Sequence, residues 1–216
     1  CDGGREALAA HDVVHNLVDL FASQIARAQH DRVALPLDAI EEALAGIAEL
    51  CDTHVHDILA TSKSLEALCL ARTCVWDESV ANRAAGIADT AGWVICNLCA
   101  ISSSTHMREV FAHHGTQDAV IAHGNSQSMN AQEESAWAFA AVSTYKGNCP
   151  SLAANPRCLT LLLKLMLSPS ASIRLQAAWA LANMTIHPDV AATLAARTGI
   201  LADVLAAVRI GSHFQS

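Results

Sequence analysis

Two tryptophans of this sequence are followed four residues later by an asparagine: Trp93 by Asn97, and Trp179 by Asn183. Side chains four residues apart lie on the same face of an α-helix, so each indole ring would stand beside a carboxamide. A carboxamide offers a peptide group both a donor and an acceptor. An indole ring can take the aliphatic stem and the cationic tip of lysine or arginine. These residue types suit polypeptide recognition rather than catalysis.

The tryptophans recur at a nearly constant interval. Trp137 stands 44 residues after Trp93 and 42 residues before Trp179, although Ala141 replaces the asparagine in this copy. In residues 173–185 the apolar side chains recur at helical spacing. A period of this length is the sequence signature of a helical solenoid, in which each repeat is one supersecondary unit.

The rest of the chain predicts short helices joined by polar loops. The sequence is 52% hydrophobic and only 4% aromatic, so alanine and leucine, which favour helices, must build most of the core. Helices are predicted within 4–21 and over 37–51, 54–60, 65–71, 87–100, 118–122, 130–143, 148–154, 158–167, 173–185, 188–196 and 200–208. Gly115, Asn155 and Gly199 are predicted as left-handed helix caps, Ser172 as an N-cap, and 123–128 as a loop.

The predicted repeat unit is a short helix, a cap, a medium helix, a polar loop and a long helix. It predicts a single array with a partial repeat over 1–53, full repeats over 54–103, 104–146 and 147–187, and a partial repeat over 188–216. In the first long helix Ala45 and Glu49 replace the tryptophan and the asparagine, while the packing residues persist. Neither end resembles a polar capping repeat, so we expect the array to be part of a longer one.

Charge and hydropathy argue against several classes of function. The net charge of −8 argues against a nucleic-acid backbone as the main partner. No apolar stretch is long enough to span a bilayer, and residues 1–30 carry charges throughout, unlike a signal peptide. Neither a phosphate-binding glycine loop nor a catalytic triad is recognisable. We therefore expect no enzyme activity, no cofactor, no nucleic-acid partner and no membrane partner.

Cysteines and histidines invite a metal interpretation that their spacing does not support. Cys96 and Cys99 have zinc-like spacing, but they lie in a predicted helix without a second ligand pair. His113, His114 and His123 cluster around a cap and a loop, where we expect surface and capping roles. Most of the eight cysteines lie in apolar helical patterns, where a free cysteine packs as a small core residue. The sequence therefore predicts no metal site and an intracellular location, cytoplasmic or nuclear.

Two segments make the chain resemble the armadillo-repeat family. Gly199–Leu205 resembles the glycine-containing step between the first two helices of that repeat, and Gln176–Asn183 resembles its third-helix signature. The resemblance covers nearly the whole chain and is strong from Asp89 onward. It implies an all-α fold, a right-handed superhelical solenoid with three helices per repeat. In that fold the third helices line a concave groove.

Within that family, the tryptophan and asparagine positions resemble those of the importin-α proteins. There the asparagines hold the backbone of an extended peptide, and the tryptophans form slots for its lysine or arginine side chains. The resemblance implies a peptide-binding groove lined by Trp93, Asn97, Trp137, Trp179 and Asn183. Ala141, Ala45 and Glu49 interrupt this series.

The function that we expect is a non-enzymatic interaction scaffold or adaptor that binds an extended segment of another protein, which is basic in one version of the hypothesis. An importin-α-like adaptor for basic nuclear localisation signals is one alternative. A fixed structural subunit of a large assembly, for example a cytoskeletal one, is another. The asparagines also have a purely structural interpretation, in which each bonds the backbone of a neighbouring helix and the tryptophan packs beside it.

Overall fold

The computed structural model describes residues 15–27, 37–51, 62–73, 80–101, 110–113, 115–186 and 188–196. Within these ranges every regular element is a helix, which confirms the predicted all-α class. The chain forms two compact units, Cys1–Ala122 and His123–Ser216. The helices predicted over 54–60 and 200–208 and the cap predicted at Gly199 lie outside the described residues. The repeat boundaries stay predictions.

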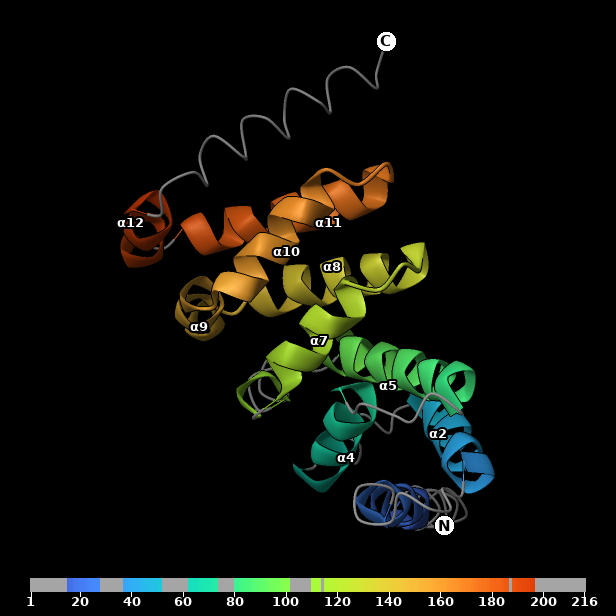
Figure 1. The fold of residues 1–216 in the computed structure, drawn as a ribbon. Helices are drawn as coiled ribbons and strands as arrows, with labels where there is room; N and C mark the ends of the chain where they lie inside the picture. Colours follow the sequence, from blue (N-terminus) through green and yellow to red (C-terminus); the bar gives the residue numbers. More distant parts are fainter. Residues whose placement is uncertain are drawn as a thin grey trace, which may run out of the picture. The chain divides into compact units, whose positions relative to one another are not determined.

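The first unit is centred on α5 (Ala81–Ile101), against which α2 (Leu37–Cys51) and α4 (Ser62–Thr73) pack (Figure 1). Residues 15–27 form a further helix of this unit. Its buried side chains recur at helical spacing and include Phe21, Ile40, Leu44, Ile47, Leu65, Leu68, Ile87, Ile95 and Leu98. Each such side chain contributes about 1.5–3 kcal/mol through its removal from water, so this core holds the helices together.

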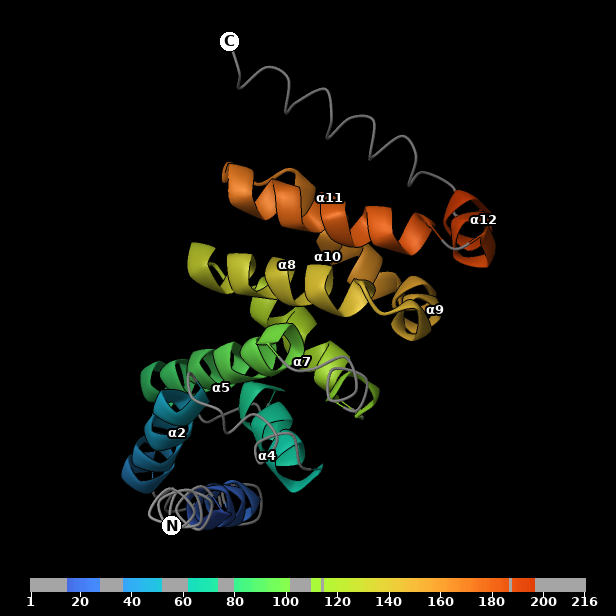
Figure 2. The same ribbon diagram turned by 180° about the vertical axis from the view of Figure 1, so that it is seen from behind.

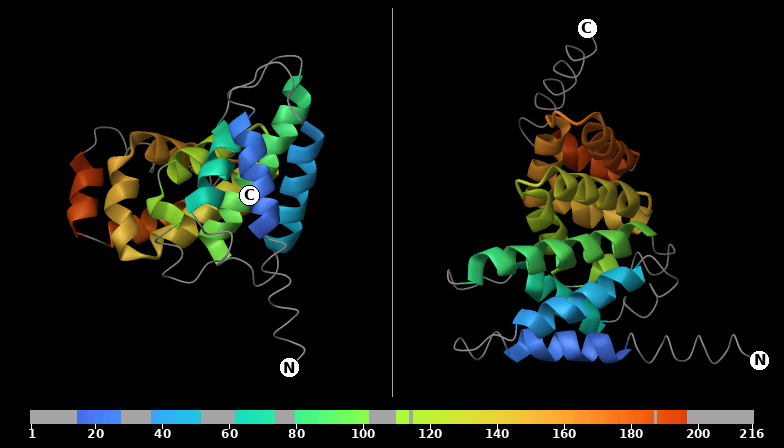
Figure 3. Two further views of the ribbon diagram at one scale, coloured as in Figure 1. Left: turned by 90° about the horizontal axis from the view of Figure 1, so that it is seen from below. Right: turned by 90° about the vertical axis from the view of Figure 1, so that its right-hand side faces the viewer.

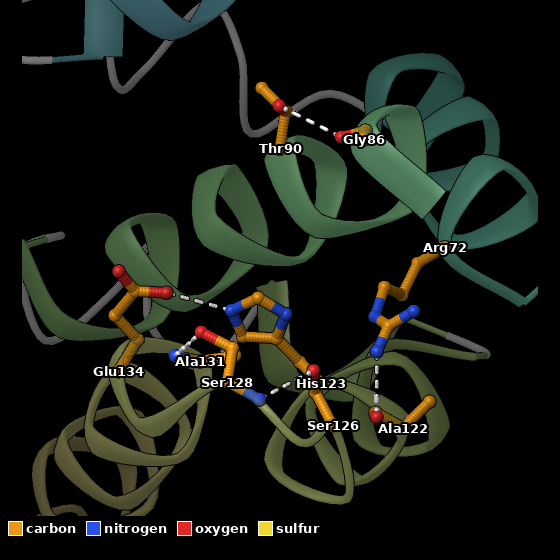
Figure 4. Close-up of polar contacts among 9 residues, drawn as sticks. All are labelled: Arg72, Gly86, Thr90, Ala122, His123, Ser126, Ser128, Ala131 and Glu134. Atoms are coloured by element: carbon orange, nitrogen blue, oxygen red, sulfur yellow. Dashed lines mark hydrogen bonds and ion pairs between the residues drawn. The ribbon is translucent and has the colours of Figure 1, made fainter. Parts of the chain in front are cut away.

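Two arginines add polar ties within the first unit. Arg83 on α5 pairs with Asp38 and Glu41 of α2, and its Nε lies 2.9 Å from Glu41 Oε1. This hydrogen bond holds the pKa of Glu41 below its usual value, although solvent screening leaves such exposed pairs with little effect on stability. Arg72 on α4 donates to the carbonyl of Ala122 at 2.7 Å (Figure 4). The guanidinium of Arg72 thereby fixes the last residue of the unit.

The helix α7 (Thr116–Gly124) follows a glycine with left-handed backbone. Gly115 has φ +97°, which confirms its predicted conformation, because glycine adopts this region without a steric penalty. The Gly115 carbonyl accepts from Ala119 N at 2.8 Å. α7 is longer than predicted: it continues through His123 and Gly124, which were predicted as part of a loop.

The second unit repeats the order of short, medium and long helices. It contains α8 (Met129–Ser143), the 3₁₀ helix η2 (Lys146–Asn148), α9 (Cys149–Ala154), α10 (Pro156–Met166), α11 (Ala171–Thr185) and α12 (Pro188–Ala196). The long helices α8 and α11 run side by side (Figures 2 and 3), α10 packs against α11, and α9 and α12 pack against each other. The predicted helix 188–196 is confirmed.

The start of α11 differs from the prediction by two residues. The N-cap is Ser170, whose Oγ accepts from Ile173 N. The prediction of Ser172 as the cap is wrong, because the helix already begins at Ala171. The hydroxyl of Ser172 is instead bonded to the carboxylate of Glu133 on α8, so it joins the first turn of α11 to the second turn of α8.

The prediction for Asn155 is also wrong. Its φ of −85° and ψ of 107° are extended rather than left-handed. The following residue is Pro156, and a residue that precedes proline is pushed towards extended backbone by contact with the proline ring. Asn155 therefore caps the start of α10, and its Oδ1 accepts from Arg157 N at 3.0 Å and Cys158 N at 3.4 Å.

Substitution of Asn155 distinguishes the N-cap of α10 from a left-handed helix cap. We expect Asn155→Ala to lower the free energy of unfolding by about 1 kcal/mol, because the capping oxygen is lost, and Asn155→Gly to lower it by only a few tenths. Urea unfolding followed by circular dichroism measures both, with Asn155→Asp as the control that keeps the oxygen. A glycine variant more stable than the parent would indicate a left-handed cap instead.

Candidate functional site

Trp137 and Trp179 stand at equivalent positions of two helices that pack against each other. Trp137 on α8 is 40% exposed and Trp179 on α11 is 56% exposed. Ala138, directly after Trp137 on α8, and Ala180, directly after Trp179 on α11, are inaccessible, as is Phe139. The same helices thus place their core residues on one side and an indole on the other. We call the surface formed by Trp137 and Trp179 the tryptophan face.

Asn183 uses its amide nitrogen inside the protein. Its Nδ2 donates to Ser143 Oγ at 3.0 Å and approaches the Ala140 carbonyl at 3.5 Å, both on α8. The Ser143 hydroxyl in turn donates to the Ala140 carbonyl at 2.8 Å. Because the Ala140 carbonyl can only accept a hydrogen bond, the group of Asn183 that faces it must be the NH2 group and not Oδ1. The donors of Asn183 therefore join α11 to α8, as in the structural interpretation of this residue, and only Oδ1 is left for a ligand.

Two glutamates precede Trp137 on α8, and one of them is committed to a buried histidine. The Nε2 atom of His123 lies 2.7 Å from Glu134 Oε2, and the His123 ring is only 1% exposed (Figure 4). The expectation of a surface role for His123 is therefore wrong, because α7 continues far enough to turn this ring inward. Figure 4 also shows Ser128, the N-cap of α8, whose hydroxyl oxygen accepts from Ala131 N.

Glu133 is the exposed carboxylate of this region, one helical turn before Trp137. Its Oε1 accepts from the hydroxyl of Ser172 on α11. The tryptophan face is thus bordered by a carboxylate on α8 and by the Oδ1 of Asn183 on α11. Both groups accept hydrogen bonds, and the carboxylate favours a cationic or donor-rich ligand.

The first unit carries the other predicted pair on α5. Trp93 is half-buried, and Asn97 is 8% exposed. Asn97 Nδ2 is buried and forms no hydrogen bond with the described residues. An unbonded buried amide is unfavourable, and burial keeps the Asn97 donor away from a ligand on the surface.

Cys96 and Cys99 are both buried within α5, where their zinc-like spacing falls inside a continuous helix. Burial raises the pKa of the Cys99 thiol to about 12, so the thiolate that a metal would require is strongly disfavoured. Among the described residues, no three His, Cys, Asp or Glu side chains come together as metal ligands.

None of the described helices combines the length and the apolar character needed to cross a bilayer.

Comparison with known proteins assigns one of the repeats. Residues 148–186 match the family model described as "Armadillo/beta-catenin-like repeat", which covers α9, α10 and α11. Among solved structures, the chain is similar to a designed armadillo repeat protein in complex with the peptide (KR)4. That match has 14% sequence identity and a TM-score of 0.41, and it covers 96% of this chain and 93% of the other. No curated protein matches the sequence.

Proposed function

We propose that this chain, as a member of the armadillo-repeat family, is a non-enzymatic interaction scaffold. Its tryptophan face would bind an extended polypeptide. One observation carries the proposal: Trp137 and Trp179 occupy equivalent positions on packed helices and stay 40% and 56% exposed. Large aromatic side chains are the residues that dominate the energetics of protein interfaces. Trp137 and Trp179 lie one repeat apart, so the packing of α8 against α11 sets the distance between their rings.

The distance between the two indole rings suits a side chain of an extended peptide partner. Packed helix axes lie about 8–10 Å apart, so equivalent side chains of α8 and α11 project at about this separation. Carbon atoms in contact lie about 3.5–4.0 Å apart. An aliphatic stem inserted between the rings of Trp137 and Trp179 could therefore contact both. This geometry favours long, unbranched side chains in the partner.

The charge around the tryptophan face favours lysine or arginine at this place. Glu133 lies one turn from Trp137, and the chain as a whole has a net charge of −8. An ammonium or guanidinium group over an indole gains about 0.5–1 kcal/mol at an exposed site. Asn183 contributes through Oδ1, which can accept from a partner's N–H. We further propose that Trp93 forms a second contact on the first unit, where Asn97 is too buried to take part.

A peptide-binding measurement tests this function. We expect a labelled lysine- and arginine-rich peptide to bind the full chain and Trp137→Ala plus Trp179→Ala to weaken binding by about tenfold, because two cation–π contacts are lost. Fluorescence anisotropy measures this change, and affinity should fall as salt rises. Leu167→Ala is the matched control, since Leu167 is a comparably exposed apolar residue (51%) at the end of α10.

The outcomes of this experiment distinguish a general scaffold from a binder of basic peptides. Unchanged binding by the double variant would remove the tryptophan face as the site. Equal affinity for an acidic peptide would contradict the basic version and the importin-α-like adaptor, because Glu133 repels an acidic ligand.

A further inference from the structure

The hydroxyl of Ser143, the last residue of α8, stands in the middle of a short chain of hydrogen bonds. Its Oγ donates to the Ala140 carbonyl at 2.8 Å and accepts from Nδ2 of Asn183 on α11 at 3.0 Å. Because the Ala140 carbonyl can only accept, it sets the direction of both bonds. Hydrogen bonds in such a chain polarise one another, so each strengthens the other.

The main chain around Ser143 is also held in place. Asn148 Nδ2 donates to the Val142 carbonyl at 3.1 Å, and the Cys149 thiol donates to the Ser143 carbonyl at 3.3 Å. Ser143 is only 2% exposed, so water competes little for its hydroxyl. Ser143 therefore offers α11 an acceptor at a fixed position, and this acceptor favours one orientation of the Asn183 amide.

This orientation decides what Asn183 offers to a ligand. Its Nδ2 is bonded to Ser143 Oγ and lies 3.5 Å from the Ala140 carbonyl. A rotation that aimed the NH2 group at a ligand would break the bond to Ser143. It would also bring Oδ1 towards the Ala140 carbonyl, and two acceptors repel each other. Asn183 is half-buried and thus presents an acceptor, Oδ1, at the border of the tryptophan face.

The equivalent position on α8 supplies no carboxamide donor. It holds Ala141, which stands 42 residues before Asn183 and four residues after Trp137. The backbone of a bound peptide carries both N–H donors and carbonyl acceptors. Of these two groups, only the N–H finds a partner at the two positions that follow Trp137 and Trp179 by one helical turn.

We propose, on the basis of the function proposed above, that Ser143 is a positioning residue that makes the tryptophan face select a backbone N–H in its partner. Ser143 holds Asn183 as an acceptor, and Asn183 Oδ1 then bonds one N–H of the bound peptide beside the lysine or arginine that lies between the indoles. Proline has no N–H, so the partner is an extended basic segment without proline at this point.

Two forms of one peptide test this role. The first is a labelled peptide of alternating lysine and arginine residues, and the second is the same peptide with methylated backbone nitrogens, which keeps the charges and carbonyls but removes the donors. We expect the full chain to bind the methylated peptide about fivefold more weakly in fluorescence anisotropy, because one hydrogen bond is lost. Asn183→Ala should bind the two forms equally, which also controls for the effect of methylation on the free peptide.

Ser143→Ala tests the positioning itself. Without the hydroxyl the Asn183 amide can turn and donate to a carbonyl of the methylated peptide, so the difference between the two peptides should fall below about twofold. Ser143→Thr, which keeps a hydroxyl, should retain the fivefold difference. Because both peptides are measured on the same variant, a loss of stability alone does not change this ratio.

The results distinguish this inference from the function on which it rests. Equal binding of the two peptides by the full chain would overturn the inference, and so would a fivefold difference that persists in Ser143→Ala. If that binding still required Trp137 and Trp179, the scaffold function would stand. Failure of both peptides to bind the full chain would overturn the proposed function and this inference together.

Discussion

Replacement of Gly124 with alanine should lower the free energy of unfolding by about 1–3 kcal/mol, as expected for overpacking of a filled interior. A Cβ atom at this position would stand 2.5 Å from Ser135 Oγ and 2.8 Å from Leu161 Cδ2. Ser135 and Leu161 are both inaccessible, so neither can move into solvent to relieve the contact. Gly124→Val should be still more destabilising, because its larger side chain meets the same walls.

Gly86→Ala is the matched control, with an effect of the opposite sign. A Cβ at Gly86 would have no neighbour within 4 Å, and Gly86 is exposed in the interior of α5. Alanine there should stabilise the protein by about 0.5–1 kcal/mol, because it restricts the unfolded chain and favours helix. Urea unfolding of both variants gives the comparison. Stabilisation by Gly124→Ala would contradict the close packing of α7 against Ser135 and Leu161.

The helical conformation of Gly124 could not be predicted from the sequence. The run of small and polar residues over 123–128 predicts a loop, yet α7 includes His123 and Gly124. The reason is tertiary: the His123 ring is buried against Glu134, and Gly124 permits the close approach of Ser135. No local pattern contains Glu134 or Ser135 as partners, so composition alone could not extend the helix.

Local rules succeeded where a helix depends on its own periodicity. The predicted helices over 37–51 and 188–196 have these bounds in the structure, and Gly115 has the predicted left-handed backbone. Asn155 could have been predicted better, because the proline that follows it already disfavours a helical or left-handed conformation. At α11 a series of serines offers several caps, and only the actual helix start selects Ser170.

The candidate site, too, could be predicted from the sequence only in part. The repeat interval predicts that Trp137 and Trp179 take equivalent positions, and the structure leaves both exposed. The sequence does not specify whether Asn183 faces a ligand or a neighbouring helix, because that depends on Ser143, 40 residues earlier.

Phe139→Ala should cost about 3–5 kcal/mol of unfolding free energy, the range observed when a buried phenylalanine is truncated. Phe139 is 0% exposed in α8, and its removal would leave a cavity in the second unit. Trp137→Ala, two residues earlier on the same helix, should cost less than about 1 kcal/mol, because its ring is 40% exposed. Thermal unfolding followed by circular dichroism compares the two.

This pair separates the two roles that aromatic residues have on α8. If Phe139 supports the core and Trp137 serves a partner, Phe139→Ala lowers stability strongly, while Trp137→Ala lowers peptide affinity with little change in stability. The same exposure argument applies to Trp179, which is 56% exposed on α11. A stability loss for Trp137→Ala as large as that of Phe139→Ala would place its ring in the core. The tryptophan face would then lose one of its two indoles, and with it the spacing on which the proposed peptide contact depends.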